Sequence, residues 1–158
     1  MGGRITKAEQ QLKPDPKFDS KVLSRFINSI MLDGKKSVAQ RVVYSALDEI
    51  EKRTKGDPPA IEIFEQAINK LKPSVEVRSK RVGGTNYQVP MQVKPKRKQS
   101  LAFRWIIQAV RGESGRPMYQ CLARELLDAS KGEGKAANTR QQVHRMAEAN
   151  KAFAHFAW

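Results

Sequence analysis

Lysine and arginine are the side chains of this 158-residue sequence with the clearest capacity for chemistry, and their spacing is uneven. Thirty of them stand against sixteen Asp and Glu, which leaves a net charge of +14. The segment 76–104 contains a single acid, Glu76, and concentrates the following cations: Arg78, Lys80, Arg81, Lys94, Lys96, Arg97, Lys98 and Arg104. Positive charges in such excess repel one another within a compact monomer unless a polyanion neutralises them. The sequence therefore predicts a partner that carries phosphate.

Two further groups of polar residues could contact phosphate. Lys35 and Lys36 follow Asp33-Gly34 at the start of an expected helix, where free backbone N–H groups favour an anion, although an ordinary surface turn fits equally well. Near the end of the chain, Arg145, Asn150 and Lys151 lie along one helical stretch and suggest an RNA-binding face.

Catalysis and metal binding find no support in the sequence. It contains no Ser/His/Asp set and no nucleophile motif, and its only cysteine, Cys121, falls on an apolar helical stripe. His144 and His155 lack acidic or cysteine partners at ligand spacing. Gly83-Gly84 lacks the Lys-Ser or Lys-Thr ending of a phosphate loop. We expect no enzyme activity, no metal and no cofactor.

Apolar residues at a period of 3.6 predict the elements that position these groups. Three helices come first: one behind an Asp19 or Ser20 cap, one that ends near Gly56, and one that opens with Asp57-Pro58 and ends at Pro73. Three more follow the basic segment: one over Leu101–Val110, one over Met118–Ala129, and one that starts at a Thr139/Gln142 capping box and runs to about Ala152.

Between the two sets the period changes to two. Val75 and Val77 alternate with polar residues, as do Val89, Met91 and Val93. Pairing 75 with 91 and 77 with 89 places these side chains on one face, with the turn at 81–84. Two strands are marginal in water, so the base of the hairpin must pack on the helices while its tip projects. Tyr87 either stacks on a base or packs across the strands.

These elements predict a mostly α fold, a single bundle of about six helices with a projecting two-stranded β-hairpin arm between helices three and four. Residues 1–17 are expected to form an extended or disordered tail, and 18–158 a helical binding domain that includes the arm at 74–94. Phe153, Phe156 and Trp158 either pack on the core or stack on bases. The start of the chain resembles no signal or transit peptide, and no apolar run could span a bilayer, so we expect a cytoplasmic protein.

Acidic residues are expected to polarise the molecule. They gather around the junction of helices two and three, at Asp48, Glu49, Glu51, Asp57, Glu62 and Glu65. That junction should face away from nucleic acid. A DNA-architectural or helix-turn-helix protein is the alternative function, since an arm with basic helices can also bend or read duplex DNA. Such proteins usually dimerise, and no heptad or symmetric interface is evident.

Seven stretches resemble the bacterial-type seventh protein of the small ribosomal subunit. They are DPKF at 15–18, LDGKKSVA at 32–39, VYSALD at 43–48, VEVRSKRVGGTNYQVPMQV at 75–93, LAFRWI at 101–106, ARELLDA at 123–129 and VHRMAEANKAFAH at 143–155. The resemblance implies a structural ribosomal protein that binds the 3′ major domain of small-subunit rRNA, helps nucleate assembly of the subunit head, and lies at the subunit interface near the tRNA exit site.

Carried over by position, the resemblance adds residues to the expected rRNA-binding set. That set is Lys35, Lys36, Arg78, Lys80, Arg81, Lys94, Lys96, Arg97, Lys98, Arg104, Arg111, His144, Arg145, Asn150 and Lys151. The hairpin tip, Arg81, Val82, Gly83 and Gly84, would lie near tRNA and messenger RNA. The implied protein neighbours are the ninth and eleventh proteins of the small subunit, and no homo-oligomer is expected.

Three segments depart from the family pattern. Where the family often has a dense basic cluster at its start and a basic turn before helix five, this chain has MGGRITKAEQQ and RGESGRP. NTRQQ before His144 is also less charged than usual. The resemblance carries no RNA contact over to the first two segments and implies weaker phosphate contacts at the third.

Overall fold

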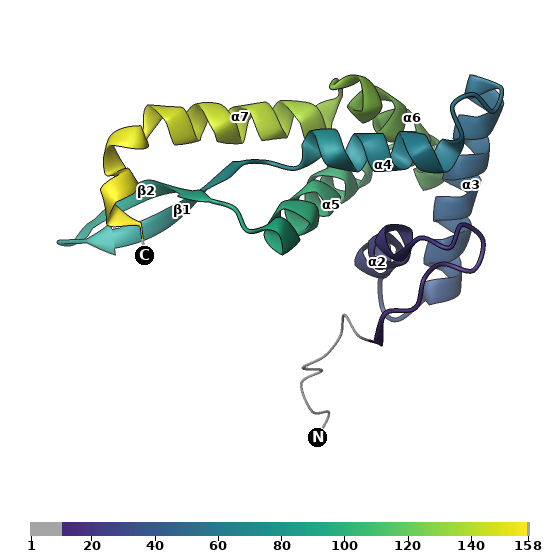
Figure 1. Cartoon of the computed structure of the whole chain (residues 1–158), viewed down its shortest axis with the longest axis horizontal. Coiled ribbons are helices and arrows are strands. Elements are labelled where there is room, and N and C mark those ends of the chain that lie inside the picture. Colours follow the sequence, from purple (N-terminus) through teal and green to yellow (C-terminus); the bar gives the residue numbers. More distant parts are fainter. Residues whose placement is uncertain (1–10, 158) are drawn as a thin grey trace.

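A computed structural model describes residues 11–157 of the chain (Figure 1). In chain order its elements are α2 (Lys21–Ile30), α3 (Lys36–Thr54), α4 (Ala60–Leu71), β1 (Val75–Val82), β2 (Thr85–Gln92), α5 (Pro95–Arg111), α6 (Met118–Lys131), α7 (Lys135–Ala149) and the 3-10 helix η1 (Lys151–Phe156). The predicted fold class is confirmed: the described chain is mostly helical, and a two-stranded hairpin lies between its third and fourth helices.

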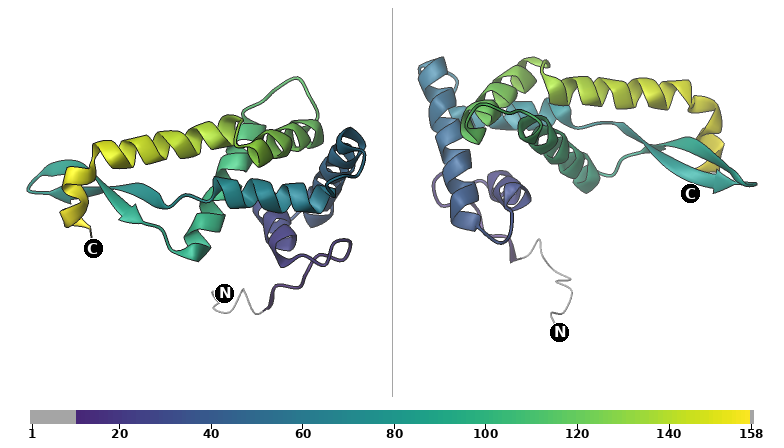
Figure 2. Two further views of the ribbon diagram at one scale, coloured as in Figure 1. Left: turned by 45° about the horizontal axis from the view of Figure 1, so that its top comes forward. Right: turned by 180° about the vertical axis from the view of Figure 1, so that it is seen from behind.

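The molecule is elongated, with the hairpin at one end and α3 at the other (Figure 1). Helices α4 and α7 run along the long axis, and both further views show α7 continuing over the strands (Figure 2). The loop between α3 and α4 therefore lies far from the hairpin tip. This arrangement places the acidic junction and the basic arm at opposite ends, as the sequence predicted.

The core lies where α2, α4 and α5 meet. Phe26 is fully buried, and its ring centroid lies 5.4 Å from that of Phe64 and 5.2 Å from that of Phe103. Leu122 and Leu126 of α6 close the same cluster. Burying a large apolar side chain stabilises a fold by roughly 1.5–3 kcal/mol, so this cluster holds the helices that carry the arm.

Three predicted helix ends agree with the structure. Ser20 caps α2, where its hydroxyl accepts a hydrogen bond from the Leu23 N–H at 3.3 Å. Helix α3 ends at Thr54, followed by a left-handed Lys55 and Gly56, and α6 ends at Lys131, two residues past the expected Ala129, followed by the left-handed Gly132. Short-range capping chemistry decides these ends, which is why the sequence shows them.

Three predicted helix starts are wrong. Helix α4 begins at Ala60 behind Pro59, so Asp57 does not cap it. Helix α5 begins at Pro95 and not at Leu101. Its first turns carry cations, which interrupt the apolar pattern but still belong to the helix. Helix α7 begins at Lys135, and Thr139 lies inside it, where its hydroxyl donates to the Lys135 carbonyl at 2.9 Å.

The start of α7 is capped by a buried acid from the preceding helix. Glu125 is 6% exposed, and its Oε1 accepts a hydrogen bond from the Ala136 N–H at 2.7 Å. Gly134, with φ at +94°, leads into the helix, and a Cβ there would lie 2.9 Å from Oε1 of Glu125. Only glycine fits this position, and the cap comes from a residue too distant in sequence for a local motif to reveal.

The chain before α2 is anchored at least from Asp15. This residue is 2% exposed; Oδ2 accepts from the backbone N–H of Lys17 at 3.1 Å, and Oδ1 accepts from the Tyr44 hydroxyl at 2.7 Å. Burial, together with this hydrogen bond, raises the pKa of Tyr44 to about 12. Folded structure therefore begins at least three residues before Phe18, and the first ten residues of the predicted tail lie outside the described part.

The register of the hairpin differs from the predicted one by one residue. The observed partners include Val75 with Gln92, Val77 with Pro90, and Arg78 with Val89. Gly83 and Gly84 form a two-residue loop with φ of +57° and +88°, and that loop sets the register. Because a shift of one residue moves a side chain to the other face, Val75 and Val77 do not share a face with Val89. The prediction of one wholly apolar face is wrong.

We expect Glu125→Ala to destabilise the protein by about 2 kcal/mol, because the substitution leaves a buried N–H group without an acceptor. Glu125→Gln keeps an acceptor oxygen and should cost less. Thermal unfolding followed by circular dichroism measures both variants, and Glu133→Ala, at an exposed position in the same region, is the matched control. Equal melting temperatures for Glu125→Ala and Glu133→Ala would contradict the capping role.

Candidate nucleic-acid interface

The arm and the first turn of α5 bring two predicted cations of segment 76–104, Arg78 and Arg97, together at Glu76. This residue is 8% exposed, and its carboxylate contacts two arginines. Oε1 lies 2.7 Å from Nη2 of Arg78, and Oε2 accepts a hydrogen bond from Nε of Arg97 at 3.1 Å. The contact joins β1 to α5. Nearby, Lys94 and Lys96 are exposed and Lys98 is half-buried.

Lys80 and Tyr87 hold the C-terminal turn on the arm. Nζ of Lys80 donates to the Phe156 carbonyl at 2.7 Å. The Tyr87 ring lies 5.0 Å from Phe153 and 5.3 Å from Phe156, measured between centroids. Of the two alternatives for Tyr87, packing within the protein is the observed one, and the aromatic tail packs on the arm rather than the central core. Trp158 lies outside the described residues.

The predicted tip of the arm is open to solvent. Arg81, Gly83 and Gly84 are exposed and Val82 is half-buried. A Cβ at either glycine would meet no atom within 4 Å, so backbone conformation and not crowding selects glycine there. The tip can approach another molecule without rearranging the fold.

His144 supports the base of the arm. Its Nε2 accepts a hydrogen bond from the Ser74 N–H at 3.3 Å, so the ring must be neutral with its proton on Nδ1. Burial, and secondarily the charge of Arg140, holds the pKa of His144 below its usual 6.5. This predicted RNA ligand thus has an internal partner. A local pattern cannot reveal that contact, because Ser74 is far away in sequence.

The other predicted residues near the C-terminus differ in their freedom. Arg145 is exposed. Nδ2 of Asn150 donates to the Met146 carbonyl at 2.8 Å, and Nζ of Lys151 lies 3.7 Å from Oε1 of Glu148, with both side chains largely exposed. An exposed pair of this kind contributes little to stability, so Lys151 remains available to a stronger anion.

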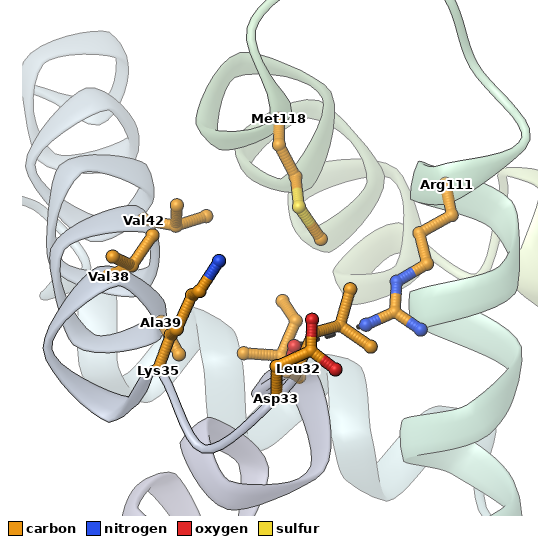
Figure 3. A pocket seen from close by; sticks show the side chains of 9 residues that line it. Leu32, Asp33, Lys35, Val38, Ala39, Val42, Arg111 and Met118 are labelled. Carbon is orange, nitrogen blue, oxygen red and sulfur yellow. Dashed lines mark hydrogen bonds between the residues drawn. The ribbon is translucent and has the colours of Figure 1, made fainter.

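A second group of predicted residues surrounds a cavity of about 260 Å³ between α3 and the ends of α2 and α5 (Figure 3). Lys35 and Arg111 stand on opposite sides of it. Nη2 of Arg111 donates to the Ile30 carbonyl at 3.1 Å, which fixes its guanidinium. The apolar lining, including Leu32 and Met118, was not predicted. Leu32 is 58% exposed and follows the end of α2, so an apolar residue outside the helical stripe was the sequence signal for this lining.

Helix α5 links the two groups of cations. Arg97 lies in its first turn and Arg111 at its last residue, so the usual rise separates the two positions by roughly 21 Å along the helix axis. Between them Arg104 is exposed and lines a second, more polar hollow with Ser29 and Gln108. Lys36 is exposed beside Lys35. The structure thus aligns Arg97, Arg104 and Arg111 along α5, between the arm and Lys35.

Across 11–157, no three His, Cys, Asp or Glu side chains lie together as metal ligands would. In the same part of the chain, none of the helices has both the length and the apolar character that crossing a membrane requires. The turn before α6 is the segment RGESGRP, where this chain departs from the basic pattern noted in the sequence. There Glu113 pairs with Arg124, while Arg116 is exposed.

Comparison with known proteins agrees with this architecture. A family model described as ribosomal protein S7p/S5e matches residues 3–151. The small ribosomal subunit protein uS7 of Rhodopirellula baltica is 60% identical over 156 residues, 99% of each chain. Proteins of the same name from Afipia carboxidovorans and Chromohalobacter salexigens are 51% and 50% identical, over 100% and 99% of each chain.

Fold and charge place the chain among basic helical proteins that carry a β-hairpin arm. With the family model matching nearly the whole chain, the particular family follows: the protein belongs to the ribosomal protein S7p/S5e family. The resemblance noted in the sequence is therefore confirmed.

The lowered pKa of His144 predicts a pH-dependent stability. Because the folded state lowers the pKa of this ring, the unfolded chain binds a proton more readily than the folded protein does. The free energy of unfolding therefore falls as the pH drops below about 6.5 and through the folded pKa. His144→Gln keeps an acceptor for Ser74 but does not titrate. Between pH 7 and pH 5 the melting temperature should therefore fall further for the unmodified chain than for His144→Gln. His155→Gln, at an exposed position, is the control, and its profile should follow the unmodified chain.

Proposed function

We propose that the chain is a structural constituent of the small ribosomal subunit that binds the 3′ major domain of 16S-type rRNA directly and helps nucleate assembly of the subunit head. The single observation that carries this proposal is the line of exposed cations from the arm along α5 to Lys35 and Arg111. The acidic α3–α4 junction lies at the opposite end of the molecule from the arm and at the opposite end of α3 from Lys35 (Figure 1). A polyanion would therefore be drawn to one side.

The shape supports structured RNA as that polyanion. Two cationic groups held roughly 21 Å apart by one rigid helix suit separate RNA segments better than one short strand. RNA helices are recognised largely by shape and backbone phosphates, which the Arg and Lys side chains can contact. The relatives' printed name, small ribosomal subunit protein, agrees with this target.

The finer placement follows from the family and from the exposed tip. Under the proposal, the protein lies at the subunit interface near the tRNA exit site, and Arg81–Gly84 lies near tRNA and messenger RNA. The ninth and eleventh proteins of the small subunit are its neighbours, and the protein acts without forming a homo-oligomer. As a bacterial-type ribosomal protein it works in the cytoplasm, without catalysing a reaction.

Binding of the full chain to a transcribed fragment of the 3′ major domain, measured at several salt concentrations, tests the proposal. Affinity should fall steeply with salt because several phosphates are neutralised. Binding of equal strength to random duplex DNA at physiological salt would overturn the proposal and favour the DNA-architectural alternative.

Arg81→Ala and Arg104→Ala test which cations take part. Both side chains are exposed, and neither has a hydrogen bond or ion pair within residues 11–157. Each substitution should flatten the dependence of log K on log salt by about 1. Because exposed substitutions usually change stability by under about 0.5 kcal/mol, the melting temperature should stay nearly constant. Arg78 and Lys80 are poorer choices, since both have internal partners. An unchanged salt dependence in both variants would remove the tip and the middle of α5 from the interface.

A further inference from the structure

Glu76 is the one acid in the basic segment 76–104, and the structure gives it an unusual environment. Its side chain is only 10% exposed, whereas those of its two partners, Arg78 and Arg97, are 45% and 37% exposed. The carboxylate therefore lies inside, with the guanidinium groups around it and still open to solvent. An acid that merely diluted the positive charge would lie at the surface.

Burial of this carboxylate is tolerated because two arginines share it. A buried charge costs free energy unless it is paired and hydrogen-bonded, and each oxygen of Glu76 has its own arginine partner. A guanidinium has five N–H donors. Arg97 uses Nε and Arg78 uses Nη2, so each keeps further donors that Glu76 does not engage.

The position of Arg97 in α5 adds a second argument. The first turn of α5 has no acidic residue, and its N-cap, Lys94, makes no side-chain capping bond. Lys96, Arg97 and Lys98 thus crowd the end of the helix where the dipole is positive, an arrangement that costs free energy. Glu76 brings one negative charge to this end from β1. A phosphate group would supply a second negative charge, since helix N-termini and arginines both favour phosphate.

We propose that Glu76 is a positioning residue for RNA binding, which holds Arg78 of β1 and Arg97 of α5 at a fixed separation so that both contact the phosphate backbone of the RNA. This inference rests on the proposed function. Without Glu76, the two like charges would repel each other, and each long side chain would have to be immobilised when RNA binds. Pre-ordering such side chains raises affinity because that cost is already met in the free protein.

The sign of one substitution separates this role from general electrostatics. Glu76→Gln removes a negative charge from a basic face, so charge alone predicts tighter RNA binding. The positioning role predicts weaker binding, by about tenfold if two arginine side chains lose their order. Glu76→Asp keeps the charge on a shorter side chain and should recover part of the affinity. Glu51→Gln makes the same change of charge at the acidic end of the molecule and should bind at least as tightly as the unmodified chain.

The experiment measures the affinity of the full-length variants for the transcribed 3′ major domain fragment, together with their melting temperatures. Glu76→Gln is also made in a chain that already carries Arg78→Gln and Arg97→Gln. If Glu76 acts through the arginines, its substitution should weaken binding in the original chain but cause no further loss in this background.

Three results would overturn the inference. One is equal or tighter RNA binding by Glu76→Gln when the unmodified chain binds. Another is a loss of the same size in the background without the two arginines, which would make Glu76 a general structural tie between the arm and α5. Failure of the unmodified chain to bind the fragment would overturn the proposed function and the inference together, whereas the first two results leave the proposed function in place.

Discussion

A two-stranded hairpin has no interior of its own, and such a hairpin alone is marginal in water. Everything that fixes the arm must therefore come from outside it. Val89 is fully buried, although each strand of the arm has only one neighbour. Helix α7 and η1 cover the arm. Phe153 and Phe156 pack against Tyr87, and His144 accepts a hydrogen bond from the N–H of Ser74, just before β1. The C-terminal part of the chain is thus the support of the arm.

The same constraint explains why several expected RNA ligands have internal partners. A cation near the base or along the covered side of the arm can contribute to holding it, as Lys80 does through the Phe156 carbonyl. A cation at the tip, such as Arg81, does not hold the arm in place and stays exposed. Binding and support are divided along the length of the arm. Arg78 and Arg97 lie between these cases, since Glu76 orders them while leaving part of each exposed.

Helix α5 joins this arm to the helical body. Its apolar side packs in the core through Phe103 and Ile106, and its exposed side carries Arg104 between the two cationic groups. A rigid helix keeps these groups at a constant separation, which a loop of equal length would not do. Cations are thereby spread along the length of α5, and the acidic α3–α4 junction lies at the end of the molecule far from the arm.

Much of this could be predicted from sequence because the determining interactions are local or periodic. The six helical stripes, the Ser20 cap and the Gly83-Gly84 turn depend on neighbours within a few residues, and the net charge depends on composition alone. The tertiary structure decided what depends on distant partners: the acid that caps α7, the contact of His144 with Ser74, and the pairing of Glu76 with Arg97. The register lay between these cases: both registers preserve alternation along each strand, and the choice between them followed from the two-residue loop that pairs Val82 with Thr85.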